Sequence, residues 1–439
     1  MGNGLYFSAT DGTQRGLWRT DFSTTLRLAS GPQYQSCSFA TAGPANLATT
    51  AYVATLGGGE SGSARAVWQT RGTPGTTRLI TRLPPGRFPA HLTTVGRRVF
   101  AGVETPGGDD FRHAVLCLDA FRNTVTHPLK DLDRLSGFAD LHGRAVFGGA
   151  IGDRGHVWVS DGTRSGTHRL LTLPRYLGLN PDGFTTFRIP GSTTAVAFHA
   201  HDLGAGDELW ITDGTTRNTR RFVDVSPGPA SSGPFALWAD PKGGIWWTAH
   251  DGKHGFEPWR LDRHGWRMLG DLVPPGPGTA SSYPMAGVST AAGYVFLADD
   301  GIHGHEPWVT NGTAAGTRIL IDTVPGAIGS EATGLLAFRD GVLIGGKSKL
   351  WYFDGTTTRL LLSFIHDPSW PEPLKASAVT HGVAYFLART NSHDPLSLWR
   401  SDGTAAGTRP VRLASGPTQP APIELCAVGD TIFFTTQTE

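Results

Sequence analysis

The sequence has little charge, few cysteines and no long apolar run. Charged residues make up 17% of its 439 residues and the formal net charge is +1, whereas soluble domains usually carry about 25%. Without a basic excess the chain lacks the main driving force for binding phosphate backbones, so we expect no nucleic-acid partner. No apolar run approaches the ~20 residues that a bilayer-spanning helix needs, so we expect no membrane insertion.

The sequence also lacks the motifs by which many enzymes and zinc proteins are recognised. Its three cysteines, Cys37, Cys117 and Cys426, are an odd number and form no Cys-x-x-Cys pair, so neither a disulfide framework nor a zinc site is indicated. There is no Gly-x-Ser-x-Gly elbow, no Walker loop and no His-Glu-x-x-His segment. No motif therefore points to a particular reaction.

What the chain does have is glycine, proline and aromatic side chains. It contains 59 Gly and 30 Pro, and 10% of its residues are aromatic. This combination indicates many short strands joined by turns. Because no apolar run at helical spacing is long enough for a stable helix, the sequence predicts an all-β fold.

A segment of the form Leu-Trp-x-x-Asp-Gly-Thr-x-x-Gly-Thr recurs in nine copies spaced by 42 to 52 residues. Leu116 replaces the tryptophan in one copy. The other eight copies carry Trp18, Trp68, Trp158, Trp210, Trp259, Trp308, Trp351 and Trp399. We expect this tryptophan to supply apolar surface between neighbouring units. The Asp-Gly-Thr segment should form a turn in which the glycine takes a positive φ.

Each copy divides into four short strands bounded by turn residues. Around Trp308 the predicted strands are 284–290, 294–298, a third that contains Trp308, and 318–322. Four strands every ~40–50 residues are typical of a β-propeller. The sequence thus predicts a single β-propeller domain over residues 1–439, with nine four-stranded blades, or eight if one degenerate copy forms no blade.

The two ends of the chain should close this propeller. The segment 423–428 reads as the first strand of a repeat and would complete the blade begun by the N-terminal strand 4–10. The last segment, 431–436, would then compete with 4–10 for the same position in that blade.

One copy of the repeat carries a clear family resemblance. Residues 296–308 read Phe-x-Ala-Asp-Asp-Gly-Ile-His-Gly-His-Glu-Pro-Trp, which resembles the ELWxxDGT-repeat proteins, a bacterial family with long arrays of this unit. The resemblance implies a propeller that is usually exported, and it implies no known reaction. The N-terminus has no secretion-signal pattern. We therefore expect an extracellular protein if a signal peptide has been removed, and a cytoplasmic one if Met1 is the native start.

The loops between second and third strands contain the most polar residues. In propellers these loops share a face with the blade-to-blade crossings, and that face usually carries function. Aligned on their tryptophans, three consecutive copies carry the same residue types at the same spacing. These are Asp202, Asp251 and Asp300 eight residues before it, His254 and His303 five before, Glu208, Glu257 and Glu306 two before, and the nearby His201, His250 and His305.

These loop residues allow three interpretations. His254, Glu257, His303 and Glu306 could act as general acids and bases, and Asp202, Asp251 and Asp300 could bind a divalent metal, for which calcium is the most suitable ion. His201, His250 and His305 could contact a ligand. Repetition from blade to blade instead favours a structural role, and no loop reads Asp-x-Asp-x-Asp-Gly.

Trp238 is the candidate aromatic platform. It lies outside the repeated tryptophan position, on a predicted first strand. An exposed tryptophan there would stack on a sugar ring or another flat ligand, whereas a buried one would be part of the core.

Two functions remain open from the sequence. The first is a non-catalytic binding propeller, monomeric and without a cofactor, for a small-molecule, carbohydrate or other surface ligand. The alternative is a propeller enzyme, a hydrolase, lyase or cyclase of bacterial specialised metabolism, that uses the His, Glu and Asp side chains of these loops.

Overall fold

The fold is taken from a computed structural model. The residues that the structure describes are 5–10, 15–20, 25–30, 36–42, 50–56, 66–70, 73–82, 89–107, 110–119, 122, 124–173, 181–189, 191–273, 280–326, 332, 334–346, 348–364, 374, 377–389, 397–411, 422–428 and 431–436. They form β-strands and turns, with one short 3-10 turn, η2 (Pro74–Thr76). In this part of the chain no helix has the length and hydropathy to cross a membrane.

The strands follow one another sheet by sheet. The first five sheets consist of β1 (Leu5–Thr10), β2 (Arg15–Thr20) and β3 (Thr25–Ser30); β4 (Ser36–Ala42), β5 (Thr50–Leu56), β6 (Ala66–Thr70) and β7 (Arg78–Arg82); β8 (Pro89–Val95), β9 (Arg98–Gly107), β10 (Asp110–Asp119) and β11 (Thr124–Leu132); β12 (Arg134–Leu141), β13 (Arg144–Ile151), β14 (Arg154–Ser160) and β15 (Thr167–Thr172); and β16 (Asp182–Arg188), β17 (Thr194–Asp202), β18 (Gly206–Thr212) and β19 (Arg220–Val223). The other five consist of β20 (Phe235–Ala239), β21 (Ile245–His250), β22 (Phe256–Asp262) and β23 (Gly265–Met268); β24 (Met285–Ser289), β25 (Tyr294–Asp299), β26 (His305–Thr310) and β27 (Arg318–Ile319); β28 (Gly334–Phe338), β29 (Gly341–Gly345), β30 (Lys349–Phe353) and β31 (Thr358–Ser363); β32 (Ser377–Thr380), β33 (Val383–Ala388), β34 (Ser397–Ser401) and β35 (Arg409–Pro410); and β36 (Pro422–Val428) and β37 (Thr431–Thr436).

Each complete sheet is a meander of four strands in sequence order. The described strands form eight such sheets, together with the three-stranded sheet β1–β3 and the two-stranded sheet β36–β37. This is the blade unit of a propeller, so the predicted all-β propeller class is confirmed. The copy that carries Leu116 in place of tryptophan does form a blade, β8–β11. Closure by pairing of the terminal strands stays a prediction.

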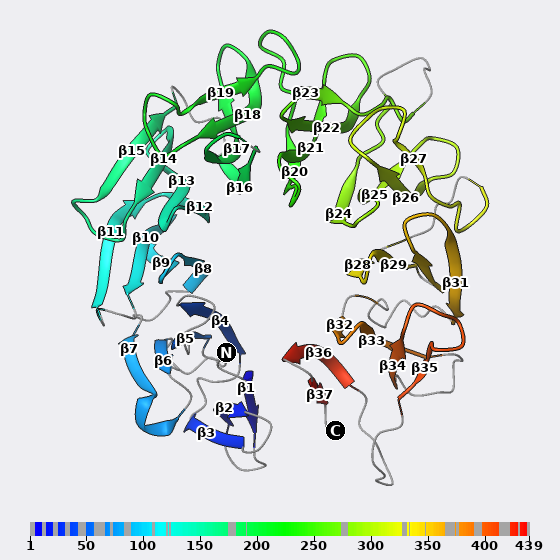
Figure 1. The fold of residues 1–439 in the computed structure, drawn as a ribbon. Helices are drawn as coiled ribbons and strands as arrows, with labels where there is room; N and C mark the ends of the chain where they lie inside the picture. The colour runs from blue at the N-terminus through cyan, green and yellow to red at the C-terminus, as the bar shows by residue number, and fades with distance from the viewer. Residues whose placement is uncertain are drawn as a thin grey trace. The chain divides into compact units, whose positions relative to one another are not determined.

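The chain divides into two compact units, Met1–Ala239 and Asp240–Glu439. In the first unit the first strands β4, β8, β12, β16 and β20 contact one another in order, and in the second unit β24 contacts β28 and β32 contacts β36. In each sheet the fourth strand forms the edge opposite the first strand, as Figure 1 shows for β11 and β31. The single-domain organisation expected from the sequence stays a prediction.

Neighbouring blades share their apolar cores. Val146 and Val157 from β13 and β14 belong to one buried cluster with Val196 and Phe198 from β17. The cluster around Phe386 likewise joins β28–β31 to β32–β35. Because both faces of an inner sheet are covered in this way, its second and third strands are buried over most of their length. Cys117 belongs to such a core and is unpaired, while the side chains of Cys37 and Cys426 lie outside the described ones.

The repeated tryptophan joins the third strand to the second. Trp308 faces Phe296 across the β25–β26 pair, and its indole N–H donates to the carbonyl oxygen of Ala298 at 3.1 Å. Trp210, Trp259 and Trp399 make the same bond to Ala200, Ala249 and Ala388. Trp308 is only 8% exposed and packs against Leu272 from the preceding crossing. The motif thus buries one large aromatic residue in each of these blades without leaving its N–H unpaired.

The turn between third and fourth strands is held by its own side chains. Asn311 accepts hydrogen bonds through Oδ1 from the backbone N–H and the hydroxyl of Thr313, at 3.0 and 2.7 Å. The hydroxyls of Thr310 and Thr317 pair across the turn at 2.7 Å. Asp213 and Asp402 accept the same pair of bonds in their own copies. This local network explains why Asp or Asn, and threonine, recur at these positions.

The glycine of this turn contacts the preceding blade. The carbonyl oxygen of Gly312 accepts hydrogen bonds from Nε and Nη2 of Arg267, at 3.0 and 2.6 Å. A Cβ at Gly312 would overlap the guanidinium of Arg260, and the residue has a φ of 91°. Glycine is therefore needed here for its backbone conformation and also for its small size, and only the first reason was foreseen from the sequence.

The same blade-to-blade contact recurs elsewhere. The carbonyl oxygen of Gly403 accepts from Arg359 Nε at 3.0 Å, and that of Gly162 accepts from the hydroxyl of Thr126. A Cβ at Gly162 would overlap the Sγ of Cys117. We call this contact of the turn glycine with the preceding blade the turn latch. It links consecutive blades at the edge where third-to-fourth-strand turns project.

Replacing the repeated tryptophan should cost far more stability than replacing an exposed one. Trp308→Phe removes a buried hydrogen bond and leaves a cavity, so we expect a loss of about 1–3 kcal/mol. Trp238→Phe is the matched control because Trp238 is 44% exposed, and it should change stability by less than about 0.5 kcal/mol. Chemical denaturation of both variants measures the difference. Equal losses would show that the repeated position has no special role in holding the blades.

Candidate functional site

The loop glutamates are buried and bonded to the blade-to-blade crossings. Glu257 is 0% exposed and accepts hydrogen bonds from the backbone N–H of Leu272 at 3.1 Å and of Ser282 at 3.1 Å. The Ser282 hydroxyl donates to the same carboxyl group at 2.6 Å. Glu208 makes the equivalent bonds to Val225 and Ser232, and Glu306 accepts from the N–H and hydroxyl of Thr323. Glu208 and Glu257 thus fasten both the start and the end of a crossing to the third strand of their blade.

Burial changes the acidity of these glutamates. Desolvation raises the pKa of Glu257 from 4.5 to about 7, against the lowering effect of its three hydrogen bonds. Desolvation raises the pKa of Glu208 and of Glu306 to about 7 as well. A nearby aspartate adds to the rise in each case: Asp271 beside Glu257, Asp224 beside Glu208, and Asp322 beside Glu306.

The loop aspartates and histidines form pairs in two consecutive blades. Asp251 Oδ2 lies 2.7 Å from His254 Nδ1, and its Oδ1 accepts from the backbone N–H of Lys253 and of His254 at 2.9 Å. Asp300 repeats this arrangement, with its Oδ2 2.6 Å from His303 Nδ1. The hydrogen bond that each histidine donates to its aspartate raises the pKa of that histidine. The side chains of His254 and His303 are 38% and 35% exposed, so the imidazoles reach solvent while the aspartates close the loops.

The copy that carries Trp210 lacks this aspartate–histidine pair. Asp202 Oδ1 accepts only from the backbone N–H of Gly204, at 2.8 Å, and lies in a loop where no histidine corresponds to His254. Asp202 Oδ2 lies 4.0 Å from Nη1 of Arg221. Across the described residues, no three His, Cys, Asp or Glu side chains gather as a metal-ligand set. A calcium site at Asp202, Asp251 and Asp300 stays a prediction.

The remaining predicted ligand contacts lie in varied surroundings. His250 Nδ1 accepts from the backbone N–H of Gly252 at 2.9 Å, and its ring lies against Phe256. His201 is half-buried near the end of β17, and His305 is half-buried at the start of β26. Trp238 is 44% exposed on β20, as a stacking platform would require. Its role as a ligand contact stays a prediction.

The structure therefore separates the residues predicted to act in catalysis. Each histidine is paired with the aspartate three residues before it, whereas each glutamate is bonded to a crossing. His254 is partly exposed, but Glu257 is wholly buried. An acid–base pair needs both groups within reach of one substrate, and the Glu257 carboxyl has no exposed surface for that purpose.

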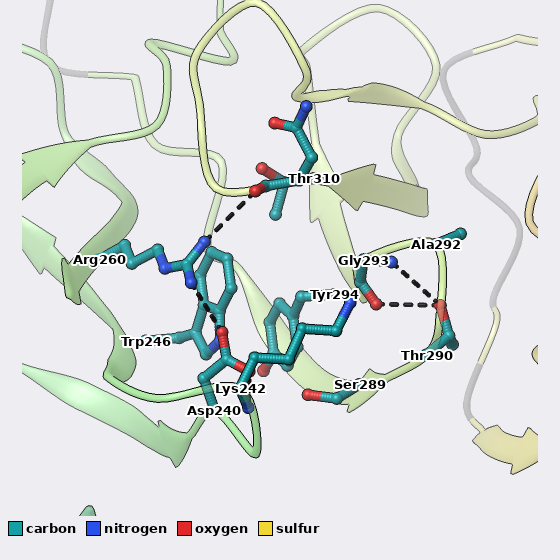
Figure 2. A pocket seen from close by; sticks show the side chains of 11 residues that line it. Asp240, Lys242, Trp246, Arg260, Ser289, Thr290, Ala292, Gly293, Tyr294 and Thr310 are labelled. Carbon is teal, nitrogen blue, oxygen red and sulfur yellow. Dashed lines mark hydrogen bonds and ion pairs between the residues drawn. The ribbon is translucent and has the colours of Figure 1, made fainter. Parts of the chain in front are cut away.

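A second site lies at the other end of the strands. We call the ends with the second-to-third-strand loops, such as 251–255 and 300–304, the loop side, and the ends with the other turns, such as 240–244 and 311–317, the turn side. On the turn side a cavity of about 100 Å³ lies between β21–β22 and β24–β26. Figure 2 shows Arg260, Trp246 and Tyr294 along it, with Lys242 and Ser289 nearby. We call this cavity the turn-side pocket.

One wall of the turn-side pocket is an aromatic stack capped by a guanidinium group. The rings of Trp246 and Tyr294 are nearly parallel, at 8°, with centroids 4.8 Å apart. The guanidinium of Arg260 lies over Trp246 at 4.2 Å. Cation–π contacts of this kind are strongest where water is excluded.

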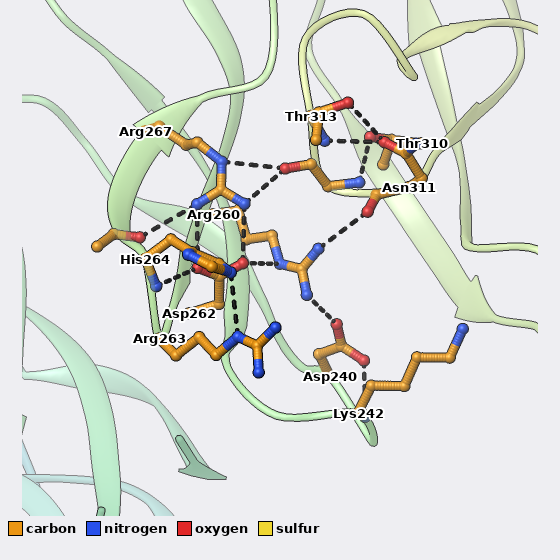
Figure 3. Close-up of polar contacts among 12 residues, drawn as sticks. Asp240, Lys242, Arg260, Asp262, Arg263, His264, Arg267, Thr310, Asn311 and Thr313 are labelled. Atoms are coloured by element: carbon orange, nitrogen blue, oxygen red, sulfur yellow. Dashed lines mark hydrogen bonds and ion pairs between the residues drawn. The ribbon is translucent and has the colours of Figure 1, made fainter. Parts of the chain in front are cut away.

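The polar network of Figure 3 fixes Arg260 in place. Its Nη2 donates to Asp240 at 2.8 Å, and its Nη1 donates to the carbonyl oxygen of Asn311 at 3.3 Å. Asp262 lies 3.3 Å from Nε of Arg260 and accepts two bonds from Arg267, at 3.0 and 2.8 Å. The bonds from Arg267 lower the pKa of Asp262 to about 2, so this carboxylate stays ionised.

The residues of this wall differ from those of the two flanking blades. Trp246 pairs in register with Arg260, where the flanking blades pair Ala197 with Ile211 and Val295 with Val309. Arg260, Tyr294 and Asp240 were not singled out from the sequence. A cation at a position that is aliphatic in both flanking copies was the signal that could have found them.

The strands and sites together define the class of the protein: it is a β-propeller. A scan against protein-family models and a search of the curated proteins both found no match. Among solved structures, the chain is similar to a prolyl endopeptidase, at 15% identity and a TM-score of 0.42, over 82% of this chain and 54% of that one. The chain thus spans about half the length of that structure.

Two further solved structures are similar to the chain. One is the β-propeller domain of the trilobed protease from Pyrococcus furiosus, at 10% identity and a TM-score of 0.38, over 73% of this chain and 96% of that one. The other is dipeptidyl peptidase 4 from Porphyromonas gingivalis, at 11% identity and a TM-score of 0.45, over 81% and 57%. At identities and TM-scores this low, no conclusion about the activity of this chain follows from these matches.

Stability should fall as the pH rises from about 4.5 to about 7. The pKa of Glu257 is raised from 4.5 to about 7, so its carboxyl group stays protonated in the folded protein after the unfolded chain has ionised, and higher pH favours unfolding. Glu257→Gln cannot ionise and should show a weaker fall over this window. Denaturant midpoints measured across the window test the difference.

The control for this pH series is Asp153→Asn, which removes an exposed carboxylate and should keep the wild-type pH dependence. A pH dependence in Glu257→Gln equal to that of the wild type would contradict the raised pKa of this buried glutamate.

Proposed function

We propose that the protein is a non-catalytic binding propeller that recognises a carbohydrate or another surface ligand on its loop side. The observation that carries this proposal is the burial of Glu257, with hydrogen bonds from the crossing to both carboxylate oxygens. A carboxylate held in this way positions the crossing and has no free surface for a substrate. The groups left exposed on these loops suit contact with a ligand.

Those exposed groups combine fixed polar atoms with apolar surface. His254 and His303 are held by their aspartates at 2.7 and 2.6 Å, so each imidazole is presented in one orientation. Ile302, beside His303, is 55% exposed. Sites for sugars and other small molecules combine apolar surface with a few positioned polar groups.

Removing both histidines should weaken binding while the fold persists. The probes are four neutral oligosaccharides, cellohexaose, xylohexaose, mannohexaose and chitohexaose, titrated by calorimetry. We expect saturable binding of at least one of them, weakened at least tenfold, or about 1.4 kcal/mol, in the double variant His254→Ala with His303→Ala.

His264→Ala is the matched control, because His264 is exposed on the turn between β22 and β23. It should bind like the wild type. Binding that survives the double variant, or no binding of any probe, would contradict carbohydrate recognition by these loops.

One observation favours the enzyme alternative, a hydrolase, lyase or cyclase. An aspartate that holds Nδ1 of a histidine leaves Nε2 to take a proton, as in many general bases. The Asp251–His254 and Asp300–His303 pairs have this arrangement. Mass spectrometry of the same four probes after incubation separates the two functions, because catalysis would change the mass of a probe and binding would not.

A further inference from the structure

We propose that the turn-side pocket binds a small organic carboxylate, such as a sugar acid. This site lies at the opposite ends of the strands from the loop side, so it does not depend on the function proposed there. The argument rests on three features: the hydrogen-bonding groups that line the pocket, the charges around it, and the residues in it that differ from those of the two flanking blades.

The hydrogen-bonding capacity left over in this pocket consists of donors. Trp246 is 5% exposed, and its indole nitrogen has no hydrogen-bond partner in the described part of the chain. The buried hydroxyl of Ser289 also has no partner there. Lys242 Nζ donates to the carbonyl oxygen of Ala291 at 3.0 Å, which leaves the ammonium two further N–H groups. A buried N–H without an acceptor costs free energy, so a ligand that supplies acceptor atoms is favoured here.

The charges around the pocket point to an anion. Arg260 is paired with Asp240 and Asp262, and Arg267 shares Asp262. Lys242 has no ion pair within the described residues, although it lies beside the pocket. Three cations thus face two carboxylates, and a ligand with one negative charge would balance the group. Arg260 is already held from three sides, so Lys242 is the cation free to turn toward a ligand.

The site is built by residues that differ from those of the two flanking blades. Trp246 replaces the aliphatic residue of the flanking blades, and Tyr294 stacks on it. A Cβ at Gly287 would overlap the phenol ring of Tyr294, so the glycine on the neighbouring strand makes room for this side chain.

The small volume of the pocket limits the size of the group that can bind in it. A cavity of about 100 Å³ accommodates a carboxylate with a few attached atoms. The pocket is partly open and Lys242 in its lining is exposed, so the rest of a ligand could lie outside. Lys242 and Ser289 both line this pocket, so one carboxylate could accept from both. The planar carboxylate would accept from the ammonium and from the neutral donors together.

The test compares glucuronate with glucose, a pair that differs by a carboxylate, on the full-length protein. Binding is followed by the indole N–H resonance of Trp246, which is assigned by its loss in Trp246→Phe. We expect a saturable shift of this resonance with glucuronate and none with glucose. Lys242→Ala should weaken glucuronate binding at least tenfold, and Ser289→Ala should weaken it by a smaller factor.

Lys253→Ala is the matched control, because it removes an exposed lysine at the loop-side end of the same sheet and should leave glucuronate affinity unchanged. The double variant His254→Ala with His303→Ala should also leave it unchanged, which separates this site from the loop side. Equal shifts with both sugars, an affinity unaffected by Lys242→Ala, or tighter binding of inorganic phosphate than of glucuronate would each overturn the proposal.

Discussion

The turn latch is the contact on which the blade arrangement depends. A four-stranded meander buries its two faces only when another sheet covers each of them, so the blades must be held together as well as formed. At Gly312 the turn of one blade meets Arg260 and Arg267 of the blade before it, and at Gly403 it meets Arg359. The side chains of Asp or Asn and threonine fix the turn, and the absence of a Cβ on the glycine lets the preceding blade approach. A motif that looks local in the sequence therefore serves a contact between units.

On the loop side the blades are connected by a different contact, in which a buried glutamate accepts hydrogen bonds from the crossing to the next blade. Since both ends of these blades are fixed by repeated residues, function is expected among the groups that the repeat leaves exposed or replaces. On the loop side these are His254 and His303, which reach solvent while their aspartates close the loops. On the turn side they are Trp246 and Arg260, which stand where the flanking blades have aliphatic residues, and Tyr294, which stacks on Trp246.

Much of the fold could be predicted because the same pattern of strand and turn residues recurs in every copy of the repeat. The predicted strands 284–290 and 294–298 correspond to Met285–Ser289 and Tyr294–Asp299. The predicted fourth strand 318–322 was too long, since β27 pairs only over Arg318–Ile319, where the chain turns away to bond Thr323 to Glu306. The site was harder to predict, because its side chains meet across blades. Glu257 and His254 look alike as loop residues, and only burial separates the crossing contact of one from the exposed pair of the other.

The most direct test of the latch compares two glycines with nearly the same backbone conformation. Gly312 and Gly265 have φ values of 91° and 96°, but a Cβ would overlap Arg260 only at Gly312, and nothing lies within 4 Å of one at Gly265. Alanine at either position incurs the conformational cost of about 1–2 kcal/mol. Gly312→Ala should lose about 1–3 kcal/mol more in denaturant unfolding, because the added Cβ must displace the Arg260 guanidinium from its bonds to Asp240 and Asn311. Equal losses in the two variants would contradict the central role of this contact.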